Sequence, residues 1–219
     1  MKDWLFSPER IAVHLPTSTA VVADLHLGYA ETRRRCGDAV PEQPMDEVLS
    51  PLLAVSLRHP VRQLVIAGDF LEGCLPAGLV ARFVRMLRGL AIELAGVVPG
   101  NHDRRLETDT VRLFSDGYTL DDWLVVHGDR PVANSRIVQG HVHPCLRVPG
   151  GRSHPCYLLR ENHIIVPAFS QDAAGVNVLS HSNWNAYRCH VCAEGTVLDF
   201  GEVGALRQRL RKQKAHPKK

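Results

Sequence analysis

Residues that bind metal ions recur in five short clusters along the chain, and each cluster directly follows a short apolar run. In sequence order, the clusters are Asp24-Leu25-His26, Gly68-Asp69, Gly100-Asn101-His102-Asp103, His127-Gly128 and Gly140-His141-Val142-His143. In open α/β sheets, ligands bind in the loops that follow the strands. If each apolar run is a strand, we therefore expect the five clusters to meet at one edge of the fold.

Seven side chains in these clusters are candidate metal ligands that combine carboxylate, imidazole and amide groups. They are Asp24, His26, Asp69, Asn101, His127, His141 and His143. This mixture of oxygen and nitrogen donors suits Mn²⁺, with Fe or Zn²⁺ as alternatives, and does not suit metals that seek thiolates. Seven ligands exceed what one ion usually takes from a protein, whereas two divalent ions that share a bridging carboxylate account for all of them. Taken alone, Asp69 would be a cap and Asn101 a turn residue, so the prediction depends on the joint pattern.

The five clusters, written as D-x-H, G-D, G-N-H-D, H-G and G-H-x-H, stand in an order that is typical of one family. In this order the chain resembles the calcineurin-like metallophosphoesterase superfamily. The resemblance implies that one metal is held by Asp24, His26, Asp69 and His143. It implies that the second metal is held by Asp69, Asn101, His127 and His141. Asp69 is then the bridging ligand.

The resemblance also implies catalytic roles for two residues that are not ligands. His102 is expected to face the substrate and to donate a proton to the leaving oxygen or stabilise developing charge, the alternative being a structural turn residue. Asp103 is expected to orient His102 through the other ring nitrogen. Asp129, where many relatives carry histidine, is expected to cap a turn and to hold a ligand histidine. The two cations of such an enzyme activate a water for in-line attack on phosphorus and neutralise the phosphoryl oxygens.

Apolar periodicity predicts the elements that position these clusters. The predicted strands cover residues 20–23, 64–67, 96–98, 123–126, 136–138, 156–159 and 163–166. Helical spacing predicts helices over residues 46–59 and 77–95, and Pro51 is expected to kink the first helix or to mark a later start. The alternation indicates an α/β layered fold whose second half is mostly sheet. The resemblance makes this fold a calcineurin-like sandwich of two mixed β-sheets flanked by helices.

Length and composition favour one catalytic domain, expected over residues 1–204. The chain has 219 residues, of which 45% are hydrophobic and 22% charged, as in ordinary globular proteins. It holds no apolar stretch of the roughly 20 residues that would cross a bilayer and no signal peptide, so we expect a cytoplasmic protein without membrane contact. The six cysteines are therefore expected to be free thiols. The alternative for Cys189-His190-Val191-Cys192 is one half of a zinc site.

The segment over residues 205–219 is a basic C-terminal tail without acidic residues. Its basic residues are Arg207, Arg209, Arg211, Lys212, Lys214, Lys218 and Lys219. Removing these seven from the 26 basic residues leaves 19 against 23 acids, so the rest of the chain carries a charge of −4 although the whole carries +3. We expect the tail to be disordered, and two interpretations stay open: a solvated end, or a contact with nucleic acid.

The substrate is less directly encoded than the metal site. The segment 22–29, with Glu31 and Arg33-Arg34-Arg35 soon after, looks like the DNA-ligase-associated branch of the superfamily. That likeness implies a Mn²⁺-dependent phosphodiesterase or nuclease that acts on DNA in repair, with single-stranded DNA as a substrate and with a DNA ligase and a helicase as functional partners. The three arginines either contact phosphates near the metals or form a solvated face.

Two other functions use the same clusters. A small-molecule phosphodiesterase or phosphatase would share every metal ligand, because substrate selection lies in the loops. A non-catalytic, metal-binding interaction module would be expected to lack His102 or a ligand, and this chain keeps all of them. The sequence does not indicate an oligomeric state.

Overall fold

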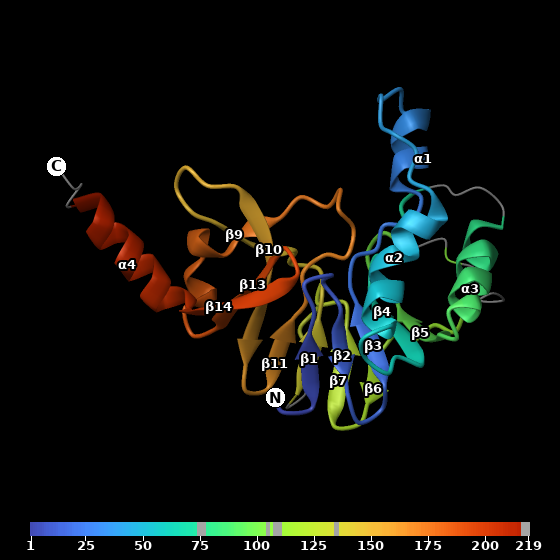
Figure 1. Cartoon of the computed structure of the whole chain (residues 1–219), viewed down its shortest axis with the longest axis horizontal. Coiled ribbons are helices and arrows are strands. Elements are labelled where there is room, and N and C mark those ends of the chain that lie inside the picture. Colours follow the sequence, from blue (N-terminus) through green and yellow to red (C-terminus); the bar gives the residue numbers. More distant parts are fainter. Residues whose placement is uncertain (74–77, 104–105, 107–110, 134–135, 216–219) are drawn as a thin grey trace.

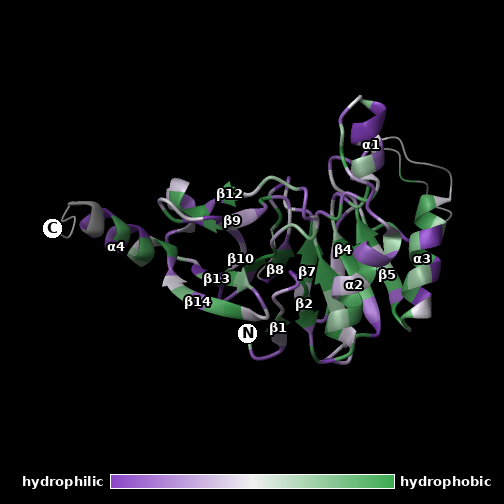
Figure 2. Cartoon of the chain, turned by 45° about the horizontal axis from the view of Figure 1, so that its top comes forward, coloured by the Kyte–Doolittle hydropathy of each residue, from purple (hydrophilic) through white to green (hydrophobic). Residues whose placement is uncertain are grey.

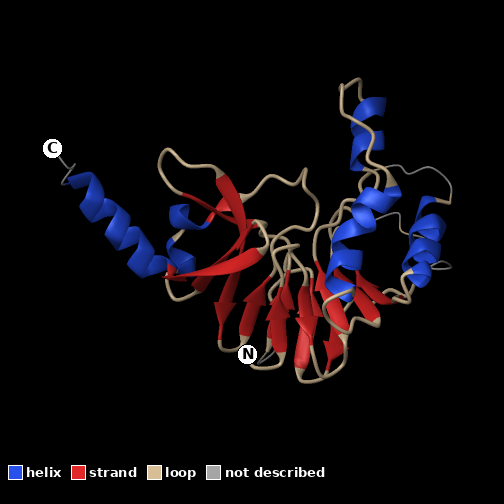
Figure 3. Cartoon of the chain, in the orientation of Figure 1, coloured by secondary structure: helices blue, strands red, loops and turns tan. Residues whose placement is uncertain are grey.

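The computed structural model describes residues 1–73, 78–103, 106, 111–133 and 136–215. They form two β-sheets that pack face to face, with helices on the outside (Figures 1 and 3). The expected sandwich of two mixed sheets is therefore confirmed. No helix among the described residues is long and apolar enough to cross a membrane.

The first sheet has the strand order β1-β2-β3-β4-β5. Its strands are β1 (Trp4–Phe6), β2 (Ala12–His14), β3 (Thr19–Val22), β4 (Gln63–Ala67) and β5 (Glu93–Val98). The first three strands pair in antiparallel fashion, whereas β3, β4 and β5 run parallel. The connections between the parallel strands contain α1 (Tyr29–Arg35), α2 (Met45–Ser56) and α3 (Leu79–Gly89). The carboxyl ends of β3, β4 and β5 consequently lie at one edge of the sheet.

The second sheet has the order β12-β9-β10-β11-β8-β7-β6, and β13 and β14 extend it beside β10. Its strands are β6 (Tyr118–Leu120), β7 (Trp123–Val126), β8 (Ile137–Gln139), β9 (Pro144–Arg147), β10 (Ser153–Arg160), β11 (His163–Ile165), β12 (Val176–Asn177), β13 (Arg188–Ala193) and β14 (Thr196–Glu202). Strands β7, β8 and β11 run parallel, so β7 and β8 also end at a common edge. Two 3₁₀ turns, η1 (Val178–Ser180) and η2 (Ser182–Trp184), and helix α4 (Val203–Ala215) complete the chain.

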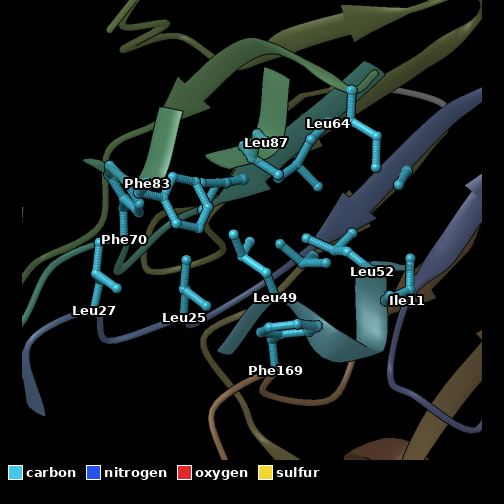
Figure 4. Close-up of a cluster of buried hydrophobic side chains, with 14 of the residues drawn as sticks. Ile11, Leu25, Leu27, Leu49, Leu52, Leu64, Phe70, Phe83, Leu87 and Phe169 are labelled. Atoms are coloured by element: carbon cyan, nitrogen blue, oxygen red, sulfur yellow. The ribbon is translucent and has the colours of Figure 1, made fainter. Parts of the chain in front are cut away.

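Alternating side chains of β3 reach two different cores. Ala20 and Val22 pack with the helices in a cluster that includes Leu52 and Phe83 (Figure 4). Val21 packs instead against the second sheet, together with Ala12 of β2 and Val65 of β4. Because successive side chains of a strand point to opposite faces, a strand buried on both faces is apolar throughout. Figure 2 accordingly shows largely hydrophobic strands in the middle of the molecule.

Pro51 lies inside α2 and does not delay the start of that helix, which begins at Met45. A proline within a helix leaves the carbonyl four residues earlier without its usual N–H donor. Here the hydroxyl of Ser50 donates a hydrogen bond of 2.9 Å to the Glu47 carbonyl oxygen. The side chain beside Pro51 thus satisfies the carbonyl group that the proline leaves free.

The helix expected over residues 77–95 is shorter in the structure. Helix α3 ends at Gly89, and the chain turns at Ala91, where φ is +58°. Residues from Glu93 onward then form β5, in which Leu94 pairs with Leu64 of β4. The apolar residues of α3 and β5 follow one helical spacing in the sequence, which is why a single long helix was expected. Parallel pairing with β4 makes the second part of this segment a strand. Ala77 lies outside the described residues.

The segment over residues 205–219 is helical as far as Ala215, in contrast to the expected disorder. Val203 and Leu206 of α4 are buried in a cluster with Leu158 of β10. The boundary expected after residue 204 thus falls inside a helix, because apolar contacts with the second sheet order its first turns. Residues 216–219 lie outside the described residues.

The two cysteines of the C-x-x-C sequence do not form half of a zinc site. Cys189 packs in the cluster beside α4, whereas Cys192 packs between the two sheets, because residues three apart on a strand face opposite ways. Burial also raises the pKa of Cys192 to about 12. All described cysteines are free, as expected, and Cys74 lies outside the described residues.

Candidate dinuclear metal site

The five sequence clusters meet at the carboxyl ends of the strands. The loops after β3 and β4 run side by side, since Asp24 N donates to Gly68 O at 3.1 Å and His26 N donates to Asp69 O at 2.9 Å. The second sheet joins this edge through its own loop after β8. There His141 N donates to Asp24 Oδ2 at 2.9 Å. One carboxylate of the first sheet therefore holds a loop of the second.

Five of the seven candidate ligands have a left-handed backbone. The values of φ are 53° for Asp24, 47° for His26, 44° for Asp69, 66° for His141 and 48° for His143. Only four other non-glycine residues of the described chain have a positive φ. Each such residue costs on the order of 1–3 kcal/mol and persists where the surrounding structure enforces it, commonly at functional sites. The backbone is strained at the residues whose side chains converge.

Glycines of the clusters provide the space in which the loops approach each other. A Cβ atom on Gly68 would lie 1.8 Å from Nδ1 of His127, and one on Gly100 would lie 2.1 Å from Oδ1 of Asp69. On Gly140 it would lie 2.8 Å from Oδ2 of Asp24. These contacts are far shorter than van der Waals distance. These positions therefore require glycine because a larger side chain would collide with the candidate ligands. This requirement is separate from any positive φ.

One group of candidate ligands surrounds His127. Its Nε2 lies 3.0 Å from Nδ1 of His141, 3.1 Å from Oδ1 of Asn101 and 3.7 Å from Oδ2 of Asp69. His127 and Asp69 are buried, whereas Asn101 and His141 are exposed. Two ring nitrogens, an amide oxygen and a carboxylate oxygen thus converge on one point. This is the donor set expected for the second metal.

A second group lies around Asp24, which is fully buried. Nε2 of His143 lies 3.4 Å from Oδ2 of Asp24, and Nδ1 of His143 contacts the Ala174 carbonyl oxygen at 3.2 Å. Burial lowers the pKa of His143, but the hydrogen bond and charge of Asp24 outweigh it and leave the pKa above its ordinary value. The ring of His26 packs edge-on against that of His143, with centroids 5.7 Å apart. These three side chains were expected on the first metal, and the structure brings them together.

Glu72 joins this site although no cluster in the sequence indicated it. Its Oε2 lies 2.8 Å from Nδ1 of His26 and 3.0 Å from Nδ1 of His102. Thr32 of α1 donates to the Glu72 carbonyl oxygen at 2.8 Å, which holds the loop after β4. With a proton on Nδ1 directed at Glu72, the lone pair of His26 is on Nε2, where a metal would bind. A single glutamate three residues after Asp69 matches no motif in the sequence, so its contact with the two histidines is visible only in the folded loop.

Asp103 has a different partner from the one expected. Its carboxylate accepts hydrogen bonds from the backbone N–H groups of Phe70 at 3.1 Å, Leu71 at 2.8 Å and Gly100 at 2.8 Å. Burial raises its pKa and outweighs these three bonds, which lower it. Asp103 therefore joins the loops after β4 and β5, and the contact to the His102 ring is made by Glu72. The reason is that both Asp103 oxygens are directed at backbone donors.

The family model for calcineurin-like phosphoesterases matches residues 17–207, which include every residue of the two ligand groups. The chain belongs to the calcineurin-like phosphoesterase family. It is therefore a metal-dependent phosphoester hydrolase, and the superfamily expected from the five clusters is confirmed. No curated protein matches the chain.

A solved structure described as the Pseudomonas putida nuclease MPE is similar to this phosphoesterase. The TM-score is 0.71 at 22% sequence identity, and the match covers 89% of this chain and 94% of the other. At that identity the likeness shows a shared fold. It agrees with the two-sheet architecture described above.

The residues of the phosphoesterase fit the divalent ions that its family uses. Oxygen and imidazole donors gather within two groups of side chains, one of them Asp69, His127 and His141 within 4.8 Å of one another. When bound, divalent ions in such a site supply Lewis acidity and activate a water as the nucleophile. His102 lies beside the ligands with 39% of its side chain exposed, so it is accessible to a substrate.

Two clefts adjoin the metal site of the phosphoesterase at different edges. One has a volume of about 530 Å³ and is lined by Asn101 and His127 together with Asp129 and Arg130. The other has a volume of about 230 Å³ and is lined by His143 and residues of β9 and β10. In the first cleft Asp129 forms an ion pair of 3.7 Å with Arg130, where a contact to a ligand histidine had been expected.

The arginines at positions 33–35 lie on α1 and are paired with acids. Arg33 contacts Asp38 at 2.7 Å, and Arg35 contacts Glu31 at 3.1 Å. Arg34 contacts Glu31 at 3.5 Å. Since all three are neutralised and exposed, the structure favours a solvated face for this run.

Proposed function

We propose that this phosphoesterase is a Mn²⁺-dependent phosphodiesterase that cuts single-stranded DNA. The observation that carries the proposal is that clefts adjoin the metal ligands at two edges, beside Asn101 and His127 and beside His143. A phosphodiester has an organic group on each side of phosphorus, whereas a monoester has one. Two clefts give both groups of a diester a place to bind.

The comparison and the first sequence cluster support the same substrate class. The similar structure is described as a nuclease. The segment around Asp24 and His26 looks like the DNA-ligase-associated branch, in which a DNA ligase and a helicase are functional partners in repair. We include these partners and the repair setting in the proposal. Mn²⁺ suits the mixture of carboxylate, amide and imidazole donors.

The chain's own residues would share the work as follows. His102 donates a proton to the leaving oxygen, since it is exposed and carries no ligand role. Glu72 holds the His102 ring through Nδ1, which leaves Nε2 for the substrate. Asp103 acts only through the backbone, because it holds the loops that carry Asp69 and Asn101.

The test compares three substrates with metal-stripped protein to which Mn²⁺ is restored. They are bis(p-nitrophenyl) phosphate, p-nitrophenyl phosphate and a single-stranded oligonucleotide. We expect cleavage of the diester and the oligonucleotide, and much slower cleavage of the monoester. Cleavage of small diesters with the oligonucleotide untouched would replace DNA by a small-molecule substrate. Restoring Zn²⁺ or Fe²⁺ in parallel identifies the metal, and a higher rate with either would contradict Mn²⁺.

A further inference from the structure

The cleft beside His143 is lined by groups that bind anions. Its polar lining includes Arg10, Arg147, Ser153 and Ser170, and it contains no acidic residue. The ring of His143 forms part of the wall, so the cleft opens directly beside a candidate metal ligand. Guanidinium and hydroxyl groups are the donors that proteins commonly use for phosphate oxygens.

Arg10 is fixed at this cleft by its backbone and by its side chain. It lies at the end of a turn, with φ of 67° and its N–H donated to the Ser7 carbonyl oxygen at 3.1 Å. Its Nη1 donates to the carbonyl oxygens of Ser170 at 2.9 Å and Ala168 at 3.3 Å. These acceptors are neutral, so the positive charge of the guanidinium is not cancelled. The turn accounts for the backbone of Arg10, and its guanidinium, held without an acidic partner among the described residues, can bind an anionic ligand.

Arg147 connects this cleft to a second basic hollow. It lines the cleft beside His143 and also a cavity of about 190 Å³ between β9 and α4. Arg207 and Arg211 of α4 line that second cavity, which again contains no acidic residue. We call Arg10, Arg147, Arg207 and Arg211 the arginine track. It leads from the metal site towards α4, at the end of the molecule opposite α1–α3 (Figure 1).

Two other hollows of the described chain have acidic residues in their walls. The cleft beside Asn101 contains Asp116 and Asp129, and the cavity beside α1 contains Glu31 and Glu42. None of the four track arginines takes part in an ion pair between described residues, whereas Arg33, Arg34 and Arg35 all do. The hollows on the His143 side of the site are therefore lined by arginines that form no ion pair between described residues.

We propose that the arginine track binds the phosphates of a single strand that flank the scissile phosphate. This inference rests on the proposed function and deepens it, because it gives the substrate a direction: from the metal site past His143 towards α4. The hollows of about 230 Å³ and about 190 Å³ share Arg147 in their walls, and proteins that bind single strands use positively charged grooves that follow the backbone. The substrate is then a polynucleotide with several phosphates.

The test is binding of fluorescent oligothymidylates to metal-stripped protein, followed by anisotropy over a range of NaCl concentrations. Arg147→Met should weaken binding of both a trinucleotide and a decanucleotide by about tenfold, the effect of one charge-assisted contact. The slope of log K against log salt should fall by about 0.7 for the lost phosphate contact. Arg211→Met should weaken only the decanucleotide, because Arg211 lies farther along the track.

Arg152→Met is the matched control, because Arg152 is exposed on the same β9–β10 hairpin and lines neither cavity. It changes the net charge by the same amount and should leave both affinities unchanged. If the Arg147→Met and Arg152→Met variants bound the oligothymidylates with equal affinity, the proposal that the arginine track binds phosphates would be wrong. Cleavage of DNA by the Mn²⁺-loaded protein in that case would leave the proposed function standing. Wild-type protein that hydrolyses bis(p-nitrophenyl) phosphate but neither binds nor cuts oligothymidylate would overturn both.

Discussion

At the scale of single residues, the site divides into candidate ligands, a proposed proton donor and two further carboxylates, those of Glu72 and Asp103. Asp69 has its Oδ1 within 2.9 Å of the His102 N–H and its Oδ2 directed at His127. Glu72 contacts two histidine rings, and Asp103 contacts backbone only. Roles assigned from residue type alone would not separate these three carboxylates, whereas their hydrogen-bond partners do.

Replacing Asp69 by Asn tests its role as a bridge. Because one carboxylate is expected to serve both ions, Asp69→Asn should lose activity and lower the metal content below two ions per chain. Metal content is measured by plasma mass spectrometry after dialysis. Asp172→Asn, at an exposed position, should keep both ions. Two tightly bound ions in the Asp69→Asn protein would refute the bridge.

Replacing His102 by Ala separates proton donation from metal binding. His102→Ala should keep the metals and lose about 10²–10⁴-fold in kcat on DNA, whose leaving alkoxide needs a proton. The loss should be much smaller with bis(p-nitrophenyl) phosphate, since p-nitrophenolate leaves without one. His154→Ala, an exposed histidine on β10, is the control. Similar losses on both substrates would show that His102 is not the proton donor.

At the scale of elements, strand ends and the turns after them place the ligands. Strands β3, β4, β5, β7 and β8 each deliver a cluster to the same edge, and glycine occupies points where two turns touch. Gly68 and Gly78 are a matched pair in this respect, since their φ values are 85° and 81°. A Cβ on Gly68 would overlap His127, whereas one on Gly78 would meet no atom within 4 Å.

Gly68→Ala and Gly78→Ala should therefore cost a similar free energy for placing alanine at positive φ. Only Gly68→Ala adds a steric overlap, with the ring of His127. Gly68→Ala should displace His127 and reduce activity by at least about 10²-fold, because small misplacements at a reacting centre are that costly. Gly78→Ala should lower the free energy of unfolding by about 1 kcal/mol and retain activity. Phosphodiesterase rates and urea unfolding measure the two effects. Equal losses of activity in both variants would show that backbone strain alone is responsible.

At the scale of the whole molecule, the site depends on how the two sheets dock. Tyr157 of β10 is fully buried between them, and its hydroxyl donates to the Ser7 carbonyl oxygen at 2.8 Å. Ser7 immediately follows β1 of the first sheet. This bond joins the sheets across their common core. Since Asp24 holds the His141 backbone in the same way, sheet docking and site assembly are linked.

Tyr157→Phe should lower the free energy of unfolding by about 1–2 kcal/mol, because the Ser7 carbonyl group stays buried without its donor. Tyr157→Ala should cost about 3–5 kcal/mol through the cavity that it leaves. Tyr118→Phe is the control, since Tyr118 is only partly buried and packs its ring on Phe114. Urea titrations followed by circular dichroism measure all three. A Tyr157→Phe protein as stable as Tyr118→Phe would show that the bond does not contribute.

The sequence by itself indicated the family and the positions of the strands that carry the clusters, and the resemblance to that family supplied the two-sheet sandwich. It could do so because metal ligands and the glycines beside them are local patterns, and because buried strands read as short apolar runs. Helix α4 and the end of α3 were not predictable in this way. Their conformation depends on apolar contacts and strand pairing with distant parts of the chain.

Only the tertiary structure decided which groups lie beside the candidate ligands and which arginines line the hollows near His143. Glu72 meets His102 from another loop, and Asp103 turns to the backbone of Phe70 and Leu71. The arginine track joins residues as far apart as Arg10 and Arg211, which no spacing in the sequence relates. Electrostatic and hydrogen-bonding partners act over a few ångströms in space, so they become visible only when the chain has folded.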